Sequence, residues 1–191
     1  MKVLAINGSA RKDGNTAILL NKVLAELVSE GIETDLMQLA GQPIQGCVGC
    51  FKCFKKKDGQ CAVETDILNE CLGRMRVADG ILLGSPTYFS DVSAAMKALI
   101  ERAGMVGRAN RDMFKGKAGA GVVAARRAGS IPAFNSLNLF FLYGQMIVPG
   151  STYWNMGIGM NPGEVSKDAE GIQTMKDLGK NMAWLLKKLH G

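Results

Sequence analysis

The sequence predicts an α/β fold in which a parallel β-sheet is covered by helices on both faces. Apolar strand-like segments and amphipathic helical segments alternate five times along the chain, which is typical of such a sheet. The first strand-like segment is almost continuously apolar, as a strand buried on both faces should be. Neither a repeat nor a domain linker interrupts the pattern. The 191 residues therefore indicate one domain spanning residues 1–191.

The elements follow one another in a regular order. Strands are expected at residues 2–7, 32–39, 79–85, 118–125 and 146–148. Helices are expected at residues 15–30, 66–76, 92–103, 132–144 and 165–189. A long loop at about 40–63 contains four of the five cysteines, and loops of that length are usually functional or disordered. In sheets of this kind ligands bind beyond the carboxyl ends of the strands, where the strand order reverses.

Charge and composition limit the classes of function. The net charge of +6 is not gathered into a long block. We interpret its densest run, Lys55–Lys57, as a solvated loop and expect no nucleic-acid partner. No signal peptide or membrane-spanning segment is visible, so we expect a cytoplasmic location and no membrane partner. The only histidine is His190, next to the C-terminus. We therefore expect no catalytic side chain and a cofactor that carries the chemistry.

The loop after the first strand, residues 8–16, suits a phosphate monoester. It matches neither the dinucleotide-binding glycine pattern nor the P-loop pattern. Ser9 and Thr16 offer hydroxyl groups, Asn15 offers an amide, and Arg11 offers a charge-assisted contact. The free N–H groups and the dipole of the following helix favour an anion. The alternative is a plain turn in which Asn15 or Thr16 caps the helix.

Two further loops follow predicted strands at the same edge of the sheet. In the loop at residues 85–89, Pro86 makes the turn rigid, while Tyr88 and Phe89 can pack on a flat ligand or fill a core or subunit contact. The loop at residues 124–130 contains two adjacent arginines. These arginines either face a ligand or point to solvent.

The cysteines form a compact group. Cys47, Cys50 and Cys53 have the spacing C-x2-C-x2-C, and Cys61 follows after seven further residues. Closely spaced thiolates of this kind bind a [4Fe–4S] cluster. A zinc site, redox-active thiols and an empty loop are the alternatives. We expect Cys71, on the apolar face of a predicted helix, to be a small buried hydrophobic residue.

The sequence resembles the NADPH-dependent FMN reductase family of flavodoxin-like proteins, and within it the iron–sulfur flavoproteins. The blocks that carry the resemblance are residues 7–16, 46–53 with Cys61, and 84–89 with Ser93 and 96–102. The resemblance implies a flavodoxin-like three-layer sandwich whose five-stranded parallel sheet has the order 2-1-3-4-5. It also implies that Cys47, Cys50, Cys53 and Cys61 are the ligands of a [4Fe–4S] cluster.

The resemblance further implies an FMN site built from the three loops. The first loop binds the flavin phosphate, the second lines the ribityl chain and isoalloxazine, and the third reaches the pyrimidine edge. The expected cofactor-binding residues are Ser9, Arg11, Asn15, Thr16, Ser85, Pro86, Thr87, Tyr88, Phe89, Ala125, Arg126, Arg127 and Gly129. A cation on the third loop would stabilise reduced flavin, which gathers negative charge near N1.

Together these features predict an FMN-dependent oxidoreductase. Electrons would pass from NAD(P)H or another reduced donor through FMN, and through the cluster where the cysteines hold one, to a small-molecule or protein acceptor. The alternative is an electron carrier that accepts electrons from ferredoxin and has no small-molecule substrate. A homodimer or homotetramer is expected because proteins of this family commonly assemble. We expect Tyr153 and Trp154 in the core or a subunit contact, the alternative being a wall of the flavin pocket.

Overall fold

The computed structural model describes all residues, 1–191, and contains a central parallel β-sheet. The strands are β1 (Lys2–Asn7), β2 (Glu33–Gln38), β3 (Gly80–Pro86), β4 (Ala118–Ala125) and β5 (Met156–Ile158). They lie in the order β2-β1-β3-β4-β5, and every neighbouring pair is parallel. This confirms the predicted sheet and its order. The strand order reverses between β1 and β3, so a ligand is expected beyond their carboxyl ends.

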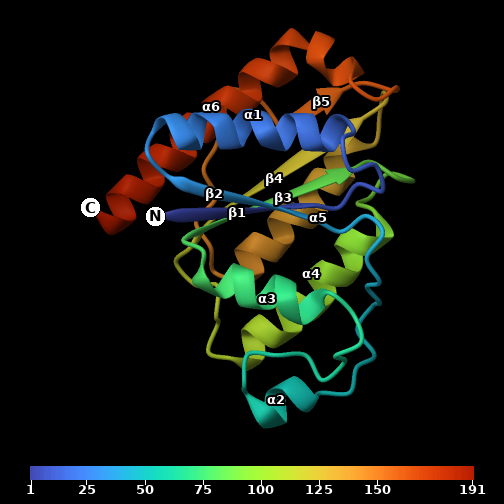
Figure 1. Ribbon diagram of the computed structural model, residues 1–191, viewed down its shortest axis with the longest axis vertical. Helices are drawn as coiled ribbons and strands as arrows, with labels where there is room; N and C mark the ends of the chain where they lie inside the picture. Colours follow the sequence, from blue (N-terminus) through green and yellow to red (C-terminus); the bar gives the residue numbers. More distant parts are fainter.

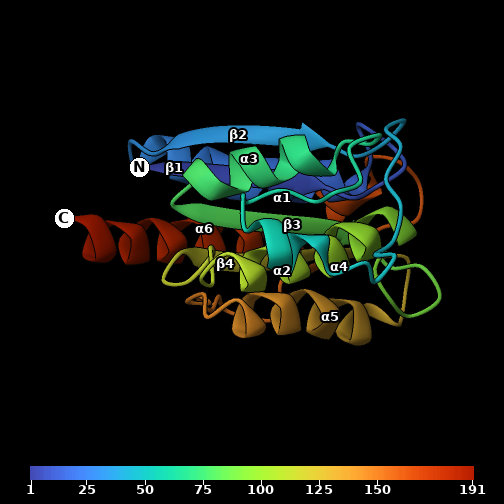
Figure 2. The same cartoon turned by 90° about the horizontal axis from the view of Figure 1, so that it is seen from below.

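Helices cover both faces of the sheet (Figure 1 and Figure 2). One face carries α1 (Asn15–Ser29) and α6 (Ala169–His190), and the other carries α3 (Leu68–Val77), α4 (Ala94–Ala109) and α5 (Ser130–Tyr143). Two short helices, α2 (Lys52–Lys56) and the 3-10 helix η1 (Glu164–Lys167), lie in the connections. None of these helices combines the length and the apolar character that crossing a membrane requires.

The strands divide their side chains between two apolar cores, one on each face. Leu4 and Ile6 of β1 belong to the core under α3, α4 and α5, whereas Val3 and Ala5 belong to the core under α1 and α6. Alternate side chains of a strand point to opposite faces, and both faces here are covered. The central strands therefore read as continuous apolar runs in the sequence.

The predicted fifth strand at residues 146–148 is wrong. The structure forms β5 at Met156–Ile158, paired with the end of β4, and Ile147 makes only an isolated bridge to Ala118 at the start of β4. Both segments lie along the same edge of β4, and the residues between them leave the sheet. Pro149 lies two residues after Ile147 and has no N–H to continue the ladder.

The last helix also begins later than predicted. Residues from Glu164 to Lys167 form the 3-10 helix, and α6 starts at Ala169. Asp168 caps α6, because its Oδ1 atom accepts a hydrogen bond of 3.0 Å from the N–H of Gly171. An aspartate at this position is a strong start signal for a helix.

Candidate functional site

The loop between β1 and α1 is fixed to the neighbouring strand and helix. The N–H of Gly8 donates to the carbonyl oxygen of Gly84 at 2.8 Å, and Ser93 Oγ donates to the carbonyl oxygen of Gly8 at 2.7 Å. A Cβ atom on Gly8 would lie 2.9 Å from Met96 and 3.2 Å from the Gly84 oxygen. Only glycine allows this close approach, which brings the first loop against the end of β3.

Side chains inside this loop hold its backbone in place. Asn7 Oδ1 accepts from the N–H of Ser9 at 3.0 Å, and Ser9 Oγ accepts from the N–H of Arg11 at 3.1 Å. Gln38 at the end of β2 donates to the carbonyl oxygen of Ser9 at 2.8 Å. Short polar side chains that bond to nearby backbone stabilise a turn. Hydrogen bonds within the protein therefore hold the conformation of this loop.

Helix α1 begins beside this loop without a side-chain cap. Its N-cap residue is Gly14, and its first turn contains no acidic residue. Asn15 does not cap the helix, because its Nδ2 atom donates to the carbonyl oxygens of Gly159 and Asn161, both at 3.0 Å. The structure therefore does not form the plain capped turn that was the alternative for this loop. The first N–H groups of α1 remain available to an anion.

The second loop contains a strained hairpin turn. Tyr88 and Asp91 exchange two backbone hydrogen bonds of 2.8 and 3.0 Å. Between them, Phe89 and Ser90 have positive φ angles of 48° and 60°. Positive φ is a genuine outlier for a bulky residue, and the Phe89 side chain is fully exposed. Strain of this kind clusters at functional sites.

The third loop contacts the second. Gly129 has a φ of 82°, and a Cβ atom there would lie 2.7 Å from Ser90 Oγ and 3.2 Å from Thr87 Cγ2. The Thr87 hydroxyl oxygen is buried and has no hydrogen-bond partner in the protein. Buried hydroxyl groups are nearly always satisfied, and Thr87 lines the cavity described next, so its hydroxyl has hydrogen-bonding capacity left for a ligand.

The three loops enclose a cavity of about 190 Å³ at the carboxyl edge of the sheet. Its walls contain Arg11 and the hydroxyls of Ser9 and Thr16 from the first loop, and Arg126 from the third. No acidic residue lines it. The residues that line it are Ser9, Arg11, Asn15, Thr16, Pro86, Thr87, Tyr88, Ala124, Ala125, Arg126, Gly159 and Met160. Positive side chains and unused N–H groups, without a carboxylate, suit an anionic ligand such as the phosphate of FMN.

The structure brings most of the expected cofactor-binding residues to this cavity, but four do not line it. Ser85 is fully buried, and its Oγ donates to the Pro86 oxygen at 2.8 Å and accepts from the N–H of Ser93 at 2.9 Å. Phe89 points to solvent, and Gly129 lies where the third loop packs closely against the second. Arg127 lines a neighbouring open cleft instead.

Three lining residues are not among those expected from the sequence. Ala124 directly precedes residues that were expected. Gly159 and Met160 come from the segment after β5, whose position the sequence pattern misplaced. The carbonyl oxygen of Gly159 accepts the hydrogen bond from Asn15, so the first loop itself holds this segment at the cavity.

The four clustered cysteines lie on the loop between β2 and α3. All are free thiols, and Cys47, Cys50, Cys53 and Cys61 line one small cavity with mainly apolar walls. No three of these thiols converge on a point as ligands of a single metal ion do. Burial raises the pKa of Cys53. The loop thus presents four thiols to a common space.

A single ion and a cluster require different arrangements of cysteine thiolates. A zinc ion holds all its sulfur ligands about 2.3 Å from one point. A four-iron cluster binds each cysteine through a different iron and so spreads the sulfurs around a larger body. The four thiols line a shared cavity of only about 20 Å³ and are not gathered around one point.

Cys71 is separate from this group. It is completely buried on α3, and burial raises the pKa of its thiol to about 12. A thiol with such a pKa is not ionised at neutral pH and is chemically inert. The prediction that Cys71 is a small buried hydrophobic residue is confirmed.

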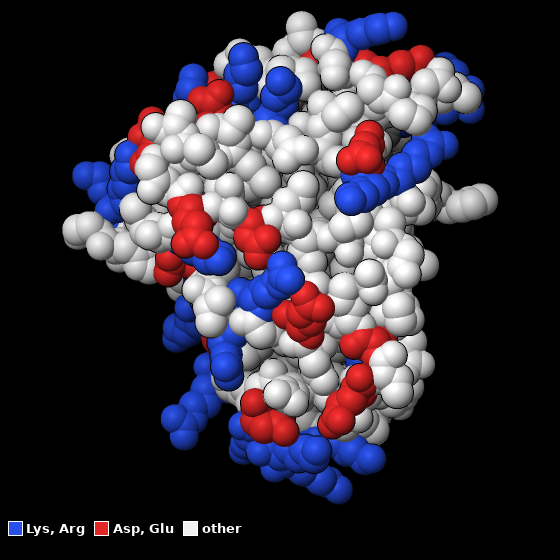
Figure 3. Space-filling model, in the orientation of Figure 1, with Lys and Arg blue, Asp and Glu red and all other residues white.

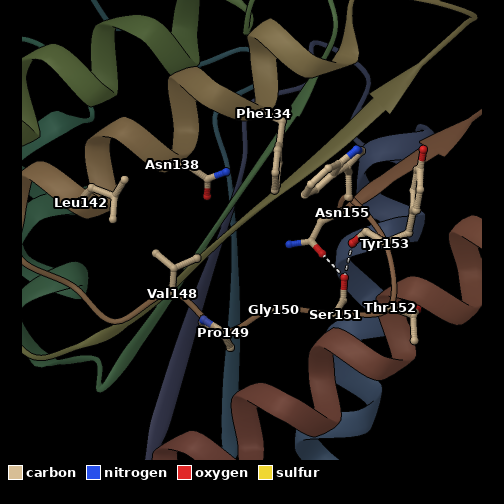
Figure 4. Close-up of a pocket in the computed structure, with 11 residues that line it drawn as sticks. Phe134, Asn138, Leu142, Val148, Pro149, Gly150, Ser151, Thr152, Tyr153 and Asn155 are labelled. Atoms are coloured by element: carbon tan, nitrogen blue, oxygen red, sulfur yellow. Dashed lines mark hydrogen bonds between the residues drawn. The ribbon is translucent and has the colours of Figure 1, made fainter.

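A larger cavity of about 450 Å³ lies between α5 and residues 148–155 (Figure 4). It shares no lining residue with the three-loop cavity. Phe134 and Asn138 of α5 and Asn155 point into it from opposite sides (Figure 4). It owes its size to the segment that leaves the sheet before β5, and its walls contain no charged residue.

Tyr153 and Trp154 line this second cavity rather than the three-loop cavity. They are 56% and 54% exposed, so they do not fill the core of the chain, and the expected subunit contact stays a prediction. The Trp154 ring lies against Phe134 with its centroid 6.4 Å away. Half-exposed aromatic rings are typical of a surface that another molecule covers.

Known proteins are similar to this chain in sequence and in fold. Residues 1–161 match the family model described as NADPH-dependent FMN reductase. The chain is 38% identical over 194 residues to an iron–sulfur flavoprotein of Methanocaldococcus jannaschii, and the alignment covers 98% of each.

Two solved structures show the same fold. RosB with the bound intermediate 8-demethyl-8-formylriboflavin-5′-phosphate superposes with a TM-score of 0.78 at 19% identity, covering 99% of this chain and 80% of RosB. An archaeal flavodoxin gives a TM-score of 0.61 at 16% identity, covering 98% of this chain and 99% of the flavodoxin. At such identities the likeness concerns the fold alone. The family match spans all three loops, and the chain belongs to the NADPH-dependent FMN reductase family of FMN-dependent oxidoreductases with the flavodoxin-like fold.

Proposed function

We propose that this chain passes electrons from a reduced donor such as NAD(P)H, through FMN in the three-loop cavity, to an acceptor, with a [4Fe–4S] cluster on the cysteine loop taking part. The observation that carries the flavin site is the three-loop cavity itself, with its two arginines, an uncapped helix N-terminus and no acidic wall. Bound FMN supplies the chemistry of hydride and single-electron transfer. The side chains bind and orient it.

The two ends of the cavity have different roles in this proposal. Arg11, the hydroxyls of Ser9 and Thr16, and the first turn of α1 hold the phosphate. Asn15 acts as a positioning residue, because its amide holds the segment at Gly159. At the other end of the cavity, Tyr88 and the unpaired Thr87 hydroxyl contact the isoalloxazine ring and the ribityl chain of FMN. Arg126 offers a positive charge to the reduced flavin.

The cysteine loop is the candidate site of a second redox centre. Its four thiols line one cavity, and the relative from Methanocaldococcus jannaschii is named an iron–sulfur flavoprotein. Cys53 and Cys61 are half-buried, whereas Cys47 and Cys50 are exposed, and the degree of solvent access influences the potential of a cluster. We propose that Cys47, Cys50, Cys53 and Cys61 are the four ligands.

Anaerobic purification, a visible spectrum, and flavin and iron analyses test both cofactors. We expect stoichiometric FMN and about four irons per chain, followed by bleaching of the flavin bands on addition of NADH or NADPH. A matched pair of variants sharpens the flavin test. Arg11→Met should weaken FMN binding because Arg11 lines the cavity, whereas Lys12→Met, at a neighbouring exposed position, should not. Wild-type protein that does not bind added FMN would refute the proposal.

A protein electron donor is the second candidate. Exposed lysines form a basic region at the lower end of the molecule (Figure 3). Lys52, Lys55 and Lys56 belong to α2 within the cysteine loop, and Lys57 directly follows it. Such a surface attracts an acidic partner such as a ferredoxin. Reduction of the flavin by reduced ferredoxin but not by NAD(P)H would favour this carrier function. Reduction by NAD(P)H with steady turnover would favour the enzyme.

We also propose that the chain forms a homodimer or homotetramer through the outer face of α5. This helix has no charged residue from Ser130 to Tyr143, although the chain carries a net charge of +6. Leu139, Leu142 and Tyr143 of α5 are all more than 60% exposed. Two copies can meet on a neutral apolar surface without like-charge repulsion.

A further inference from the structure

Arg102 of α4 is a fully buried arginine beneath the cysteine loop. Its side chain is only 1% exposed, and it lines the cavity that the four cysteines share. The buried side of α4 is otherwise made of apolar and small residues. Arginine is almost never fully buried unless specific partners compensate for the loss of water. The partners of Arg102 therefore show what it does.

The guanidinium group contacts both ends of the cysteine loop. On the entering side, Nη1 donates to the carbonyl oxygen of Gln45 at 3.1 Å. On the returning side, Nη1 also pairs with the Asp66 carboxylate, and Nη2 donates to the carbonyl oxygen of Val63 at 3.1 Å. Nη2 also donates to Cys61 Sγ at 3.3 Å. One planar guanidinium group therefore connects the two ends of the cysteine loop, residue 45 and residues 61–66, which we call its neck.

Asp66 completes this neck. Its carboxylate is 4% exposed and accepts hydrogen bonds from the N–H groups of Gln45 at 3.1 Å and Leu68 at 3.2 Å, in addition to Arg102. The buried pair therefore ties residue 45, residue 66 and the start of α3 together. Removing one member of a buried pair leaves an uncompensated charge, so the two residues act as one unit.

One donor of Arg102 has no acceptor. Its Nε atom is buried and makes no hydrogen bond within the protein. Buried N–H donors are nearly always satisfied. An arginine that already donates to one ligand sulfur, and that has a spare donor, is equipped to face a negatively charged group held by four thiolates.

We propose that Arg102 is the positioning residue of the cysteine loop, clamping its neck and donating to Cys61 Sγ so that a bound cluster is favoured in its reduced state. The clamp concerns the protein alone. The effect on the cluster rests on the proposed function. Hydrogen bonds to ligand sulfurs and nearby positive charge stabilise the more negative, reduced form of an iron–sulfur cluster and raise its potential.

Arg102→Lys tests the clamp, with Arg108→Lys as the matched control. Lysine keeps the charge and the partner Asp66 but cannot reach four acceptors with one planar group. Arg108 lies on the same helix and also pairs with an aspartate, but it is exposed. Trypsin cleaves after lysine as well as after arginine, so neither substitution removes a cleavage site. The lysines at 52 and 55–57 then report loop opening through the rate of limited trypsin cleavage of the cluster-free protein.

We expect several-fold faster cleavage in the loop for Arg102→Lys, and the wild-type rate for Arg108→Lys. In reconstituted protein we expect a lower cluster potential for Arg102→Lys, while the FMN potential stays unchanged. Wild-type cleavage rates refute the clamp, and an unchanged cluster potential refutes the hydrogen bond to the cluster. Wild-type protein that takes up no iron refutes the cluster in the proposed function, and the cleavage rates still decide the clamp.

If Arg102→Lys does not fold, as shown by circular dichroism, the double variant Arg102→Met with Asp66→Leu replaces it. This variant removes both buried charges together, which is often tolerated when the replacements pack well. The same cleavage and potential measurements apply, and the same outcomes decide the proposal.

Discussion

Asp66 makes the stability of the cysteine loop dependent on acid pH. Burial alone would raise its pKa, but hydrogen bonds from Arg102 and from the backbone N–H groups of Gln45 and Leu68 hold the pKa below its usual value of 3.8. A carboxylate with a lowered folded-state pKa stabilises the protein above its unfolded-state pKa. That stabilisation is lost as the pH falls from the unfolded-state value through the folded-state value.

We therefore expect Asp66→Asn to lower the free energy of unfolding at pH 7 by about 3 kcal/mol. The difference from wild type should shrink as the pH falls below 3.8, the ordinary aspartate pKa. Urea unfolding of the cluster-free protein at several pH values measures this. Asp112→Asn is the control, because Asp112 pairs with Arg108 at the surface and exposed pairs contribute little. A deficit that persists undiminished at pH 3 would contradict the argument.

The two adjacent arginines of the third loop differ in their position. Arg126 lines the three-loop cavity, whereas Arg127 lines only the neighbouring cleft. We expect Arg126→Ala to lower the two-electron potential of bound FMN by roughly 20 mV, because one exposed charge at contact distance is worth about 1 kcal/mol. Arg127→Ala is the matched control and should shift it less. Spectroelectrochemistry of both variants measures the potentials, and equal shifts would exclude a specific role for Arg126.

At the scale of elements, the hairpin turn after β3 combines strain with exposure. Phe89 holds a φ of 48° and is fully exposed, an arrangement that persists when function requires it. We expect Phe89→Gly to raise the free energy of unfolding by about 1 kcal/mol, since glycine adopts positive φ without the side-chain clash, and to weaken FMN binding. Gln145→Gly relieves similar strain, at a φ of 54°, after α5, and should stabilise without affecting FMN.

Urea unfolding and fluorescence titration with FMN measure the two effects for both variants. Weaker FMN binding in Phe89→Gly alone would place Phe89 at the ligand once it is bound. If FMN binding is unchanged, the expectation that Phe89 lines the isoalloxazine fails.

The secondary-structure elements differ in how well the sequence pattern predicts them. Residues 81–83 are buried on both faces, so their apolar run indicates a strand at once. The last strand lies at the edge of the sheet. Residues 148–155 separate β5 from the isolated bridge at Ile147, and no local pattern distinguishes the two segments. Gly159 and Met160 were missed with it. The contact of Arg102 with both ends of the loop depends on residues 36 to 57 positions away, which no local spacing reveals.

At the scale of the whole molecule, charge is distributed unevenly over the surface. Lysines gather around α2 at one end (Figure 3), and α5 is neutral along its length. Long-range repulsion between two positively charged copies is weakest where neither presents charge. The uncharged face of α5 and the adjoining aromatic cavity are therefore where self-association costs least.

A single charge on this face tests the assembly. A symmetric contact places Leu142 of one copy near the same region of the other, so Leu142→Glu introduces two buried, unpaired carboxylates for each contact. We expect light scattering after size exclusion to show a dimer or tetramer for wild type and a smaller species for Leu142→Glu, with FMN retained. Val28→Glu is the control, because Val28 is a similarly exposed apolar residue of α1 on the opposite face. A monomeric wild type, or a variant with the wild-type mass, would show that α5 does not mediate assembly.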